Sequence, residues 1–297
     1  MKKIAAVLLV LLVIGLTPAV AQRVDPVDAA VARYFSEWPS NGRIAPQEDV
    51  VAKVAAGEAM TLIDIRSAAD YAKGHLKGAI SLPWGTAALS DNLRYLPHDG
   101  QVFVYCYTGQ TAGQAVALLN VAGVPAQSVR FGWNLGISKV ANVEAVTTTD
   151  ATAVSTARTW QIDPTIEAAY RAYYSDMAGK VGTPVANNII AEAEAKRILD
   201  ANDRNYAFVS IRRAADFANG HIAGATNIPW GQGMDQFFPN LDARKTLIVY
   251  CYTGQTAGQA VAMLRLLGYD AVSLRGGMGT AANAPQGWSN QGFPVVK

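Results

Sequence analysis

The sequence is short of charge, histidine and cysteine, and each shortage excludes a class of protein. Charged residues make up 16% of the 297 residues and hydrophobic residues 51%, whereas soluble domains contain roughly 25% charged residues. This composition excludes a disordered or polyelectrolyte chain. The three histidines and the two cysteines, Cys106 and Cys251, lack the spacing of a zinc site. We therefore expect neither a metal nor another cofactor.

Long apolar runs are also missing, except at the N-terminus. Lys2 and Lys3 precede the apolar run Ile4–Leu16, and the tripeptide ending at Ala21 matches the small-x-small pattern of signal peptidase cleavage. The run is shorter than the roughly 20 residues that a membrane helix needs. Residues 1–21 therefore predict a secretory signal peptide, with an uncleaved anchor as the alternative. After cleavage we expect a periplasmic or secreted protein with no stable membrane insertion.

The charge is nearly balanced, which limits the possible partners. The formal net charge is +2, and both excess basic residues lie inside the predicted signal. Because nucleic-acid binding relies on a basic surface, no nucleic-acid partner is expected.

An internal repeat dominates the rest of the chain. Val104–Ala117 and Val249–Ala262 both read VYCYTGQTAGQAVA, so all fourteen positions agree at an offset of 145. The ten positions before them, Arg94–Phe103 and Pro239–Ile248, agree at only one. A recent duplication would have spared these flanks as well, so the copies diverged there while the cysteine segments stayed alike.

A second repeated block indicates the domain organisation. Leu62–Trp84 and Phe208–Trp230 share an arginine after an apolar run, a Gly-His pair and a Pro-Trp pair, at an offset of 146. The stretch Val146–Thr159 is rich in Thr, Ala and Ser and lacks apolar periodicity, which is typical of a linker. The repeats predict one domain over 27–143, a linker over 144–162 and a second domain over 163–297.

Within each copy, short β-rich runs alternate with helical patterns. In the first copy the β-rich runs are 61–65, 79–82, 102–105 and 128–131, and the helical stretches include 46–56 and 110–122. This alternation predicts βαβ units and a parallel sheet. In the helix after Cys106, Ala112, Val116 and Leu119 recur at helical spacing, which predicts one buried face and an end at Gly123.

Each cysteine is expected where a buried parallel strand ends and a helix begins, the position at which open α/β sheets bind ligands. The segment 106–112 contains Gly109, which permits positive φ, and no proline. Backbone N–H groups of the loop and of the first helical turn can therefore form an anion cradle that stabilises a thiolate.

Three interpretations of this loop compete. The cysteine can be a nucleophile that carries a sulfur atom as a persulfide. The loop can be a phosphate cradle of the cysteine phosphatase type, but Ala112 and Ala257 stand where such loops need an arginine. The cysteine can also be a small buried hydrophobe, which the polar loop around it disfavours.

These residues resemble the rhodanese family of sulfurtransferases. The resemblance rests on Cys-x-x-Gly-x-Thr-Ala at 106–112 and 251–257 and on the repeated block before each loop, and it covers nearly all of the chain after the predicted signal. It implies an α/β fold of two similar domains, each an open five-stranded parallel sheet flanked by helices. It also implies transfer of sulfane sulfur from a small donor to cyanide or a thiol through a cysteine persulfide.

The expected site is present in both copies. Cys106 and Cys251 are the expected nucleophiles. The residues expected to bind the anionic donor are Tyr107, Thr108, Gly109, Gln110 and Thr111, their counterparts Tyr252, Thr253, Gly254, Gln255 and Thr256, and Arg66 and Arg212.

The sequence departs from the family pattern in two ways. Tandem members commonly keep the cysteine only in the second domain, whereas both copies carry it here. Members that use thiosulfate often have basic residues after the cysteine, whereas Tyr-Thr follows in both copies. A polysulfide or organic persulfide therefore fits the loop better than doubly charged thiosulfate.

Two repeated charged positions also have structural interpretations. Arg66 and Arg212 can reach a substrate, but pairing with an aspartate four residues on, Asp70 or Asp216, is favoured. Asp64 is replaced by serine in the second copy, so a helix cap is expected at this position instead of a catalytic carboxylate.

Two repeated aromatic positions have similar interpretations. His75 and His221 are expected to hydrogen-bond a turn instead of acting as bases. Trp84 and Trp230 are expected to pack at the domain surface.

Two other functions stay open at this point. A non-catalytic carrier would hold the persulfide and deliver it to a protein acceptor. A thiol–disulfide protein would pair Cys106 with Cys251, although neither loop has the Cys-x-x-Cys arrangement that favours dithiol exchange.

Overall fold

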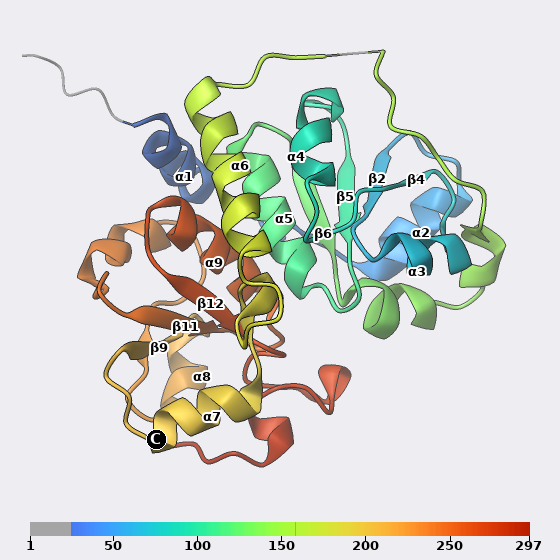
Figure 1. Ribbon diagram of the computed structural model, residues 1–297. Coiled ribbons are helices and arrows are strands. Elements are labelled where there is room, and N and C mark those ends of the chain that lie inside the picture. Colours follow the sequence, from blue (N-terminus) through green and yellow to red (C-terminus); the bar gives the residue numbers. More distant parts are fainter. Residues whose placement is uncertain (1–24, 158) are drawn as a thin grey trace, which may run out of the picture.

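The computed structural model describes residues 25–157 and 159–297, and the predicted signal peptide lies outside them. The chain forms two five-stranded parallel sheets, each flanked by helices (Figure 1). The predicted fold class is therefore confirmed. Within the described ranges, no helix has both the length and the apolar character needed to cross a membrane.

The first sheet has the strand order β1-β6-β5-β2-β4, with all neighbours parallel. Its strands are β1 (Ile44–Ala45), β2 (Thr61–Asp64), β4 (Ala79–Ser81), β5 (Val102–Tyr105) and β6 (Ala126–Val129). The helices of this half are α2 (Gln47–Ala55), α3 (Ala68–Lys73), α4 (Ala88–Asn92) and α5 (Gln110–Val121). The central strand β5 is buried along its whole length, as a strand covered on both faces should be.

The second sheet repeats this order as β8-β12-β11-β9-β10. Its strands are β8 (Ile189–Ile190), β9 (Tyr206–Ser210), β10 (Thr226–Asn227), β11 (Thr246–Tyr250) and β12 (Ala271–Leu274). Its helices are α7 (Glu192–Asp200), α8 (Ala214–Asn219) and α9 (Gln255–Leu266). The cysteines follow β5 and β11, the central strand of each sheet.

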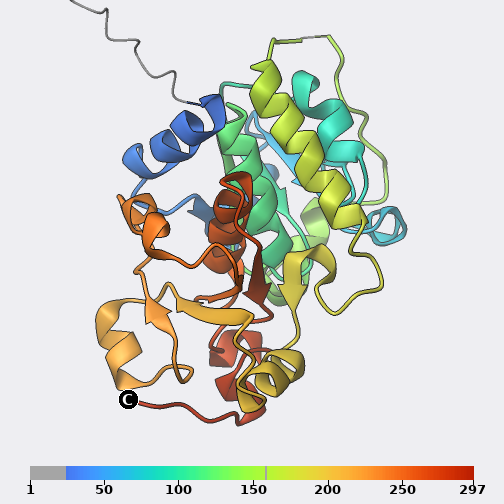
Figure 2. The same cartoon turned by 60° about the vertical axis from the view of Figure 1, so that its left-hand side comes forward.

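The leading helix of each half packs against the other half. Helix α1 (Pro26–Ser36) lies beside the 3-10 helix η6 (Met234–Asn240), the orange segment of Figure 2, and the rings of Phe35 and Trp230 are 5.7 Å apart. Helix α6 (Pro164–Ala178) contacts α4, and the rings of Trp84 and Tyr174 are 5.3 Å apart. The two repeated tryptophans therefore pack between the halves, which confirms their predicted packing role.

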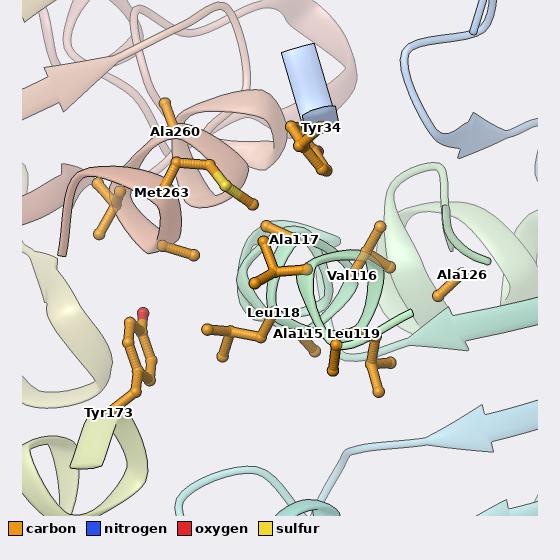
Figure 3. Close-up of a cluster of buried hydrophobic side chains, with 14 of the residues drawn as sticks. Tyr34, Ala115, Val116, Ala117, Leu118, Leu119, Ala126, Tyr173, Ala260 and Met263 are labelled. Carbon is orange, nitrogen blue, oxygen red and sulfur yellow. The ribbon is translucent and has the colours of Figure 1, made fainter. Parts of the chain in front are cut away.

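Helices α5 and α9 form the centre of the contact between the halves. Apolar side chains of both helices, with Tyr34 and Tyr173 from the leading helices, make up one hydrophobic cluster (Figure 3). A Cβ at Gly113 would lie only 2.2 Å from the Gln255 carbonyl oxygen, and a Cβ at Gly258 only 2.3 Å from that of Gln110. The absence of side chains at these two glycines therefore permits the close approach.

The prediction of a single buried face on the helix after Cys106 is wrong. Besides the predicted face, Gly113, Gln114 and Ala117 of α5 are buried as well. The cause is the second domain, because α9 covers the side of α5 that a lone domain would expose to water. The predicted end of the helix is confirmed, since Gly123 follows the last turn with φ 98°.

The segment predicted as a linker is partly ordered against the first half. Strand β7 (Thr147–Thr148) pairs antiparallel with β3 (His75–Leu76). The indole of Trp160 donates a hydrogen bond of 2.9 Å to the Leu96 carbonyl. The chain thus runs along the first sheet before it enters α6.

Candidate active site

Each cysteine sulfur lies at the carboxyl end of its central strand, where Cys106 Sγ accepts two backbone hydrogen bonds and Cys251 Sγ accepts one. The Gly109 N–H donates to Cys106 Sγ at 3.1 Å, and the Ala112 N–H donates at 3.4 Å. In the second half, the Gly254 N–H donates to Cys251 Sγ at 3.1 Å. Amides that point at a sulfur favour negative charge on it. Each cysteine is 2% exposed and neither is in a disulfide.

A glycine in the left-handed region makes this turn possible. Gly109 has φ 91° and Gly254 has φ 90°, and each is the residue just before α5 or α9. Residues with a side chain rarely adopt this backbone conformation. The glycine thus turns its N–H back to the sulfur while the helix starts behind it.

The loop after the neighbouring strand, β6 or β12, hydrogen-bonds the backbone of the cysteine. The Trp133 N–H donates to the Cys106 carbonyl at 2.7 Å, and the Met278 N–H donates to the Cys251 carbonyl at 2.8 Å. These two residues were not expected at the site. Each stands four residues after the end of β6 or β12, and no repeated motif marks the position, since the two residue types differ.

Gln110 and Gln255 lie in the cysteine loops, but their side chains cross to the other half. Gln110 Nε2 donates to Ser273 Oγ at 2.7 Å, and Gln255 Nε2 donates to Ser128 Oγ at 2.8 Å. Each glutamine also donates to the next carbonyl of the opposite strand, that of Leu274 or Val129. Their side-chain amide groups therefore join the two halves, while Gln255 also lines the cavity beside Cys251.

The loop tyrosines are held by the aspartate of the neighbouring helix. Tyr107 Oη donates to Asp70 at 2.6 Å, and Tyr252 Oη donates to Asp216. Hydrogen bonds from Lys73 and then from Tyr107 hold the pKa of Asp70 well below its ordinary value. Both tyrosines are half-buried, as are the loop residues Thr108, Thr111, Thr253 and Thr256.

The expected pairing of Arg66 with Asp70 is wrong. Arg66 instead forms a buried ion pair of 2.6 Å with Asp64 and donates to the Gly74 carbonyl at 2.7 Å. Asp70 pairs with Lys73 at 2.8 Å. The reason is the direction of the chain, because Arg66 lies in the turn after β2 and not yet on α3. Its guanidinium also lies 4.2 Å from the Trp133 ring.

The expected helix cap at position 64 is wrong as well. Asp64 accepts from the Arg66 N–H at 2.9 Å, and the residue that caps α3 is Ser67. In the second half Ser210 Oγ accepts from the Arg212 N–H at 3.4 Å, and no side chain caps α8. Position 64 is thus a partner of the buried arginine.

Arg212 is buried without a carboxylate at the position of Asp64. It donates to the Gly220 carbonyl, and its guanidinium lies 5.7 Å from the Tyr250 ring and 6.0 Å from the Tyr252 ring. Its Nε has no hydrogen-bond partner among the described residues. The expected pairing with Asp216 is also wrong, because that carboxylate pairs with Arg213 at 2.8 Å.

The repeated histidines contact backbone carbonyls, in keeping with their predicted structural role, but the carbonyls at Nδ1 belong to helices α3 and α8 and not to a turn. His75 Nδ1 lies 2.8 Å from the Tyr71 carbonyl oxygen, and its Nε2 lies 3.1 Å from that of Asp150. His221 Nδ1 lies 3.0 Å from the Phe217 carbonyl oxygen. In both histidines, Nδ1 is thus occupied by a backbone carbonyl of the preceding helix, α3 or α8.

A cavity of about 230 Å³ opens beside Cys251 and is lined by both halves. The second half contributes Cys251, Tyr252 and Thr253, and the first half contributes Arg130 and Phe131. Arg130 directly follows β6 and was not predicted as a site residue. Its recurrence as Arg275 at the repeat offset is the signal that could have found it.

Comparison with known families gives two matches within this chain. The model of the Rhodanese-like domain matches residues 47–141 and again residues 192–282, which together exceed half of the sequence. Each match contains one cysteine loop.

Several solved structures are similar to this chain. A rhodanese-related protein from Thermoplasma volcanium is 28% identical over 36% of this chain and 95% of that chain, with a TM-score of 0.31. A thiosulfate sulfurtransferase from Pseudomonas aeruginosa is 19% identical over 89% of this chain and 47% of that chain, with a TM-score of 0.33. SseA from Escherichia coli, described as a 3-mercaptopyruvate sulfotransferase, is 18% identical over 78% and 97%, with a TM-score of 0.35. By its two domain matches, this chain belongs to the rhodanese-like domain family.

Proposed function

We propose that this protein is a sulfurtransferase that carries sulfane sulfur as a persulfide on Cys106 and Cys251. The observation that carries the proposal is the sulfur geometry, in which backbone amides donate to Sγ at the end of the central strand in both halves. A persulfide places its negative charge one atom further from the chain, still within reach of a loop of amide dipoles. Family membership supports the same chemistry.

The first half-reaction loads the cysteine. The thiolate attacks the sulfane sulfur of a donor, which is thiosulfate, a polysulfide or a persulfide. The new S–S bond forms as the donor's S–S bond breaks, and the leaving group, sulfite in the case of thiosulfate, departs with the electron pair. The enzyme is left with a terminal persulfide anion near the Gly109 or Gly254 N–H.

The second half-reaction unloads it. Cyanide or an acceptor thiolate attacks the terminal sulfur, and the cysteine thiolate leaves with the electron pair of the broken S–S bond. The products are thiocyanate or an acceptor persulfide, and no external oxidant or reductant is needed. The acceptor thiolate can belong to a small molecule or to a protein.

Intact mass measurement tests the loading step. After incubation with thiosulfate or polysulfide, the wild-type protein should gain up to two sulfur atoms. Cys106→Ser and Cys251→Ser should each lose one of the two additions. Absence of any added sulfur with every donor would refute the proposal.

Turnover distinguishes an enzyme from a carrier. Steady-state release of thiocyanate from donor and cyanide is expected for the sulfurtransferase. A protein that loads sulfur but releases it to neither cyanide nor a small thiol would instead be a carrier for a protein acceptor. A Cys106–Cys251 bridge found by non-reducing mass mapping would favour the thiol–disulfide alternative.

We also propose that the protein is exported to the periplasm or secreted. The support is the basic, apolar and small-residue order of residues 1–21. N-terminal sequencing of the protein expressed with this segment in a bacterial host should find a start after Ala21 in the exported fraction. A full-length cytoplasmic product alone would refute export.

A further inference from the structure

Two arginines flank each cysteine loop, one from its own half and one from the other. Arg66 lines a surface cavity together with Tyr107, and Arg275 lies between two residues that contact Gln110. In the second site, the Arg212 guanidinium lies 6.0 Å from the Tyr252 ring, and Arg130 lines the cavity of Cys251. The repeat offsets make these two pairs equivalent.

Both arginines near Cys106 are paired with buried carboxylates. Arg66 pairs with Asp64 at 2.6 Å, and Arg275 pairs with Glu192 at 2.6 Å. The two acidic side chains are 0% and 1% exposed, and Arg66 is buried as well, whereas Arg275 is 48% exposed. Water therefore screens the Arg66 pair poorly and the Arg275 pair more strongly. The positive charge beside the Cys106 loop is therefore neutralised.

Neither arginine near Cys251 has such a carboxylate. Ser210 stands at the position of Asp64, and Gln47 stands at the position of Glu192. Over the ranges that the structure describes, Arg130 and Arg212 form no ion pair. Two independent substitutions thus remove negative charge from the same site.

The remaining charges at the two loops do not offset this difference. Asp70 pairs with Lys73 beside the first loop, and Asp216 pairs with Arg213 beside the second. Each of these pairs is neutral. The charges of these equivalent side chains therefore sum to zero around Cys106, whereas two positive charges, those of Arg130 and Arg212, stay uncompensated around Cys251.

We infer that the two sites differ in the charge of the donor they accept. Cys251 takes dianionic donors of the thiosulfate class, and Cys106 takes donors with less charge. The loops carry no cation of their own, so the positive field at Cys251 comes from Arg130 across the domain boundary and from Arg212 beside the Tyr252 ring. This inference rests on the proposed persulfide chemistry.

Single-cysteine variants and two matched donors test it. Cys106→Ser isolates Cys251, and Cys251→Ser isolates Cys106. Thiosulfate and the methanethiosulfonate anion both donate a sulfane sulfur, with sulfite or methanesulfinate as the leaving group, but they differ by one negative charge. The loading rate of each cysteine is measured by intact mass with both donors. The thiosulfate-to-methanethiosulfonate rate ratio should be about tenfold higher at Cys251, equivalent to about 1.4 kcal/mol.

Isosteric exchanges identify the residues responsible. In the Cys106→Ser variant, which keeps only Cys251, Gln47→Glu should give Arg130 a carboxylate partner and lower the donor rate ratio. In the Cys251→Ser variant, which keeps only Cys106, Glu192→Gln should leave Arg275 without its carboxylate partner and raise the ratio. Arg130→Gln should lower the ratio at Cys251, while the equivalent Arg275→Gln should change the ratio at Cys106 far less. Added salt should shrink each difference.

The outcomes separate the inference from the proposed function. Loading of both cysteines with equal donor ratios, or ratios that none of the exchanges moves, would overturn the inference and leave the sulfurtransferase proposal intact. Failure of both cysteines to load with either donor or with polysulfide would overturn both. Circular dichroism of each variant establishes that it is folded before the rates are compared.

Discussion

The cysteine segments and their flanks differ sharply in how well the two halves agree. Val104–Ala117 and Val249–Ala262 are identical, whereas the ten residues before them share one position. The structure gives the identical segment two tasks, because it forms the amide cradle of each sulfur and also the contact between α5 and α9. The flanking residues have neither task. Agreement between the halves therefore follows shared physical constraints.

The contact itself is nearly symmetric. Gln110 and Gln255 exchange hydrogen bonds across it, and Gly113 and Gly258 each face the backbone of the opposite glutamine. In such an isologous contact, each residue type meets the same surroundings twice. The charges next to the loops break this symmetry, since carboxylates neutralise the arginines around Cys106 but not those around Cys251.

The largest expected effect sharpens the charge comparison. Asp64→Ser leaves Arg66 buried without its carboxylate, and loss of one partner of a buried ion pair costs about 3 to 5 kcal/mol. Ser210→Asp makes the reverse change beside Arg212 and should raise the free energy of unfolding or leave it unchanged. Urea denaturation measures both. Equal destabilisation by the two variants would contradict the assigned role of Asp64.

The next effect tests the symmetry of the helix contact. Gly113→Ala and Gly258→Ala each place a Cβ against a carbonyl oxygen, so each should lower the free energy of unfolding by about 1 to 3 kcal/mol. Gly231 has open space around it, and Gly231→Ala serves as the matched control. A loss confined to one of the two interface variants in urea denaturation would show that the contact is not equivalent in the two halves.

A smaller effect is expected from the glutamine exchange. Gln110→Ala and Gln255→Ala each remove a hydrogen bond to a buried serine hydroxyl and another to a buried carbonyl, and each should lower the free energy of unfolding by about 0.5 to 1.5 kcal/mol. Gln101→Ala, at an exposed position, is the control. The double variant should show non-additive loss in a double-mutant cycle if the two glutamines stabilise one common contact. Strict additivity would mean that they act independently.

The smallest effect depends on pH. Tyr252 and then Arg213 lower the pKa of Asp216 below its ordinary 3.8. The ionised carboxylate therefore stabilises the folded state above that pH, and the contribution is lost as the pH falls through the lowered folded-state value. The difference in unfolding free energy between wild type and Asp216→Asn should stay constant down to about pH 4 and then shrink. A difference that disappears already near neutral pH would contradict this assignment.

Local pattern was sufficient for much of the fold. The β-rich runs at 61–65 and 102–105 became β2 and β5, and the stretch 110–122 became α5. Alternation of strand and helix predicted the parallel sheets, and the glycine after each cysteine predicted the turn that directs an N–H at the sulfur. These features depend on residues close together in the chain, whose backbone preferences and periodicity the sequence displays directly.

Local pattern failed where the partner lies in another element. The i,i+4 spacing suggested Asp70 as the partner of Arg66, but the helix starts only after Arg66, and the strand residue Asp64 is nearer. The predicted face of α5 omitted Gly113 and Gln114 because the covering helix belongs to the other half. Spacing rules for one helix do not include a second one.

The sequence alone determined two repeated α/β units and a cysteine at the end of each central strand. Tertiary structure decided how the units meet. It determined that the leading helices α1 and α6 each pack against the other half and that Gln110 binds a serine 163 residues away. It also determined which arginine lines the cavity of Cys251. The reason is physical. Hydrophobic periodicity specifies that a face is buried but not what buries it, and that choice depends on the fit of two finished surfaces.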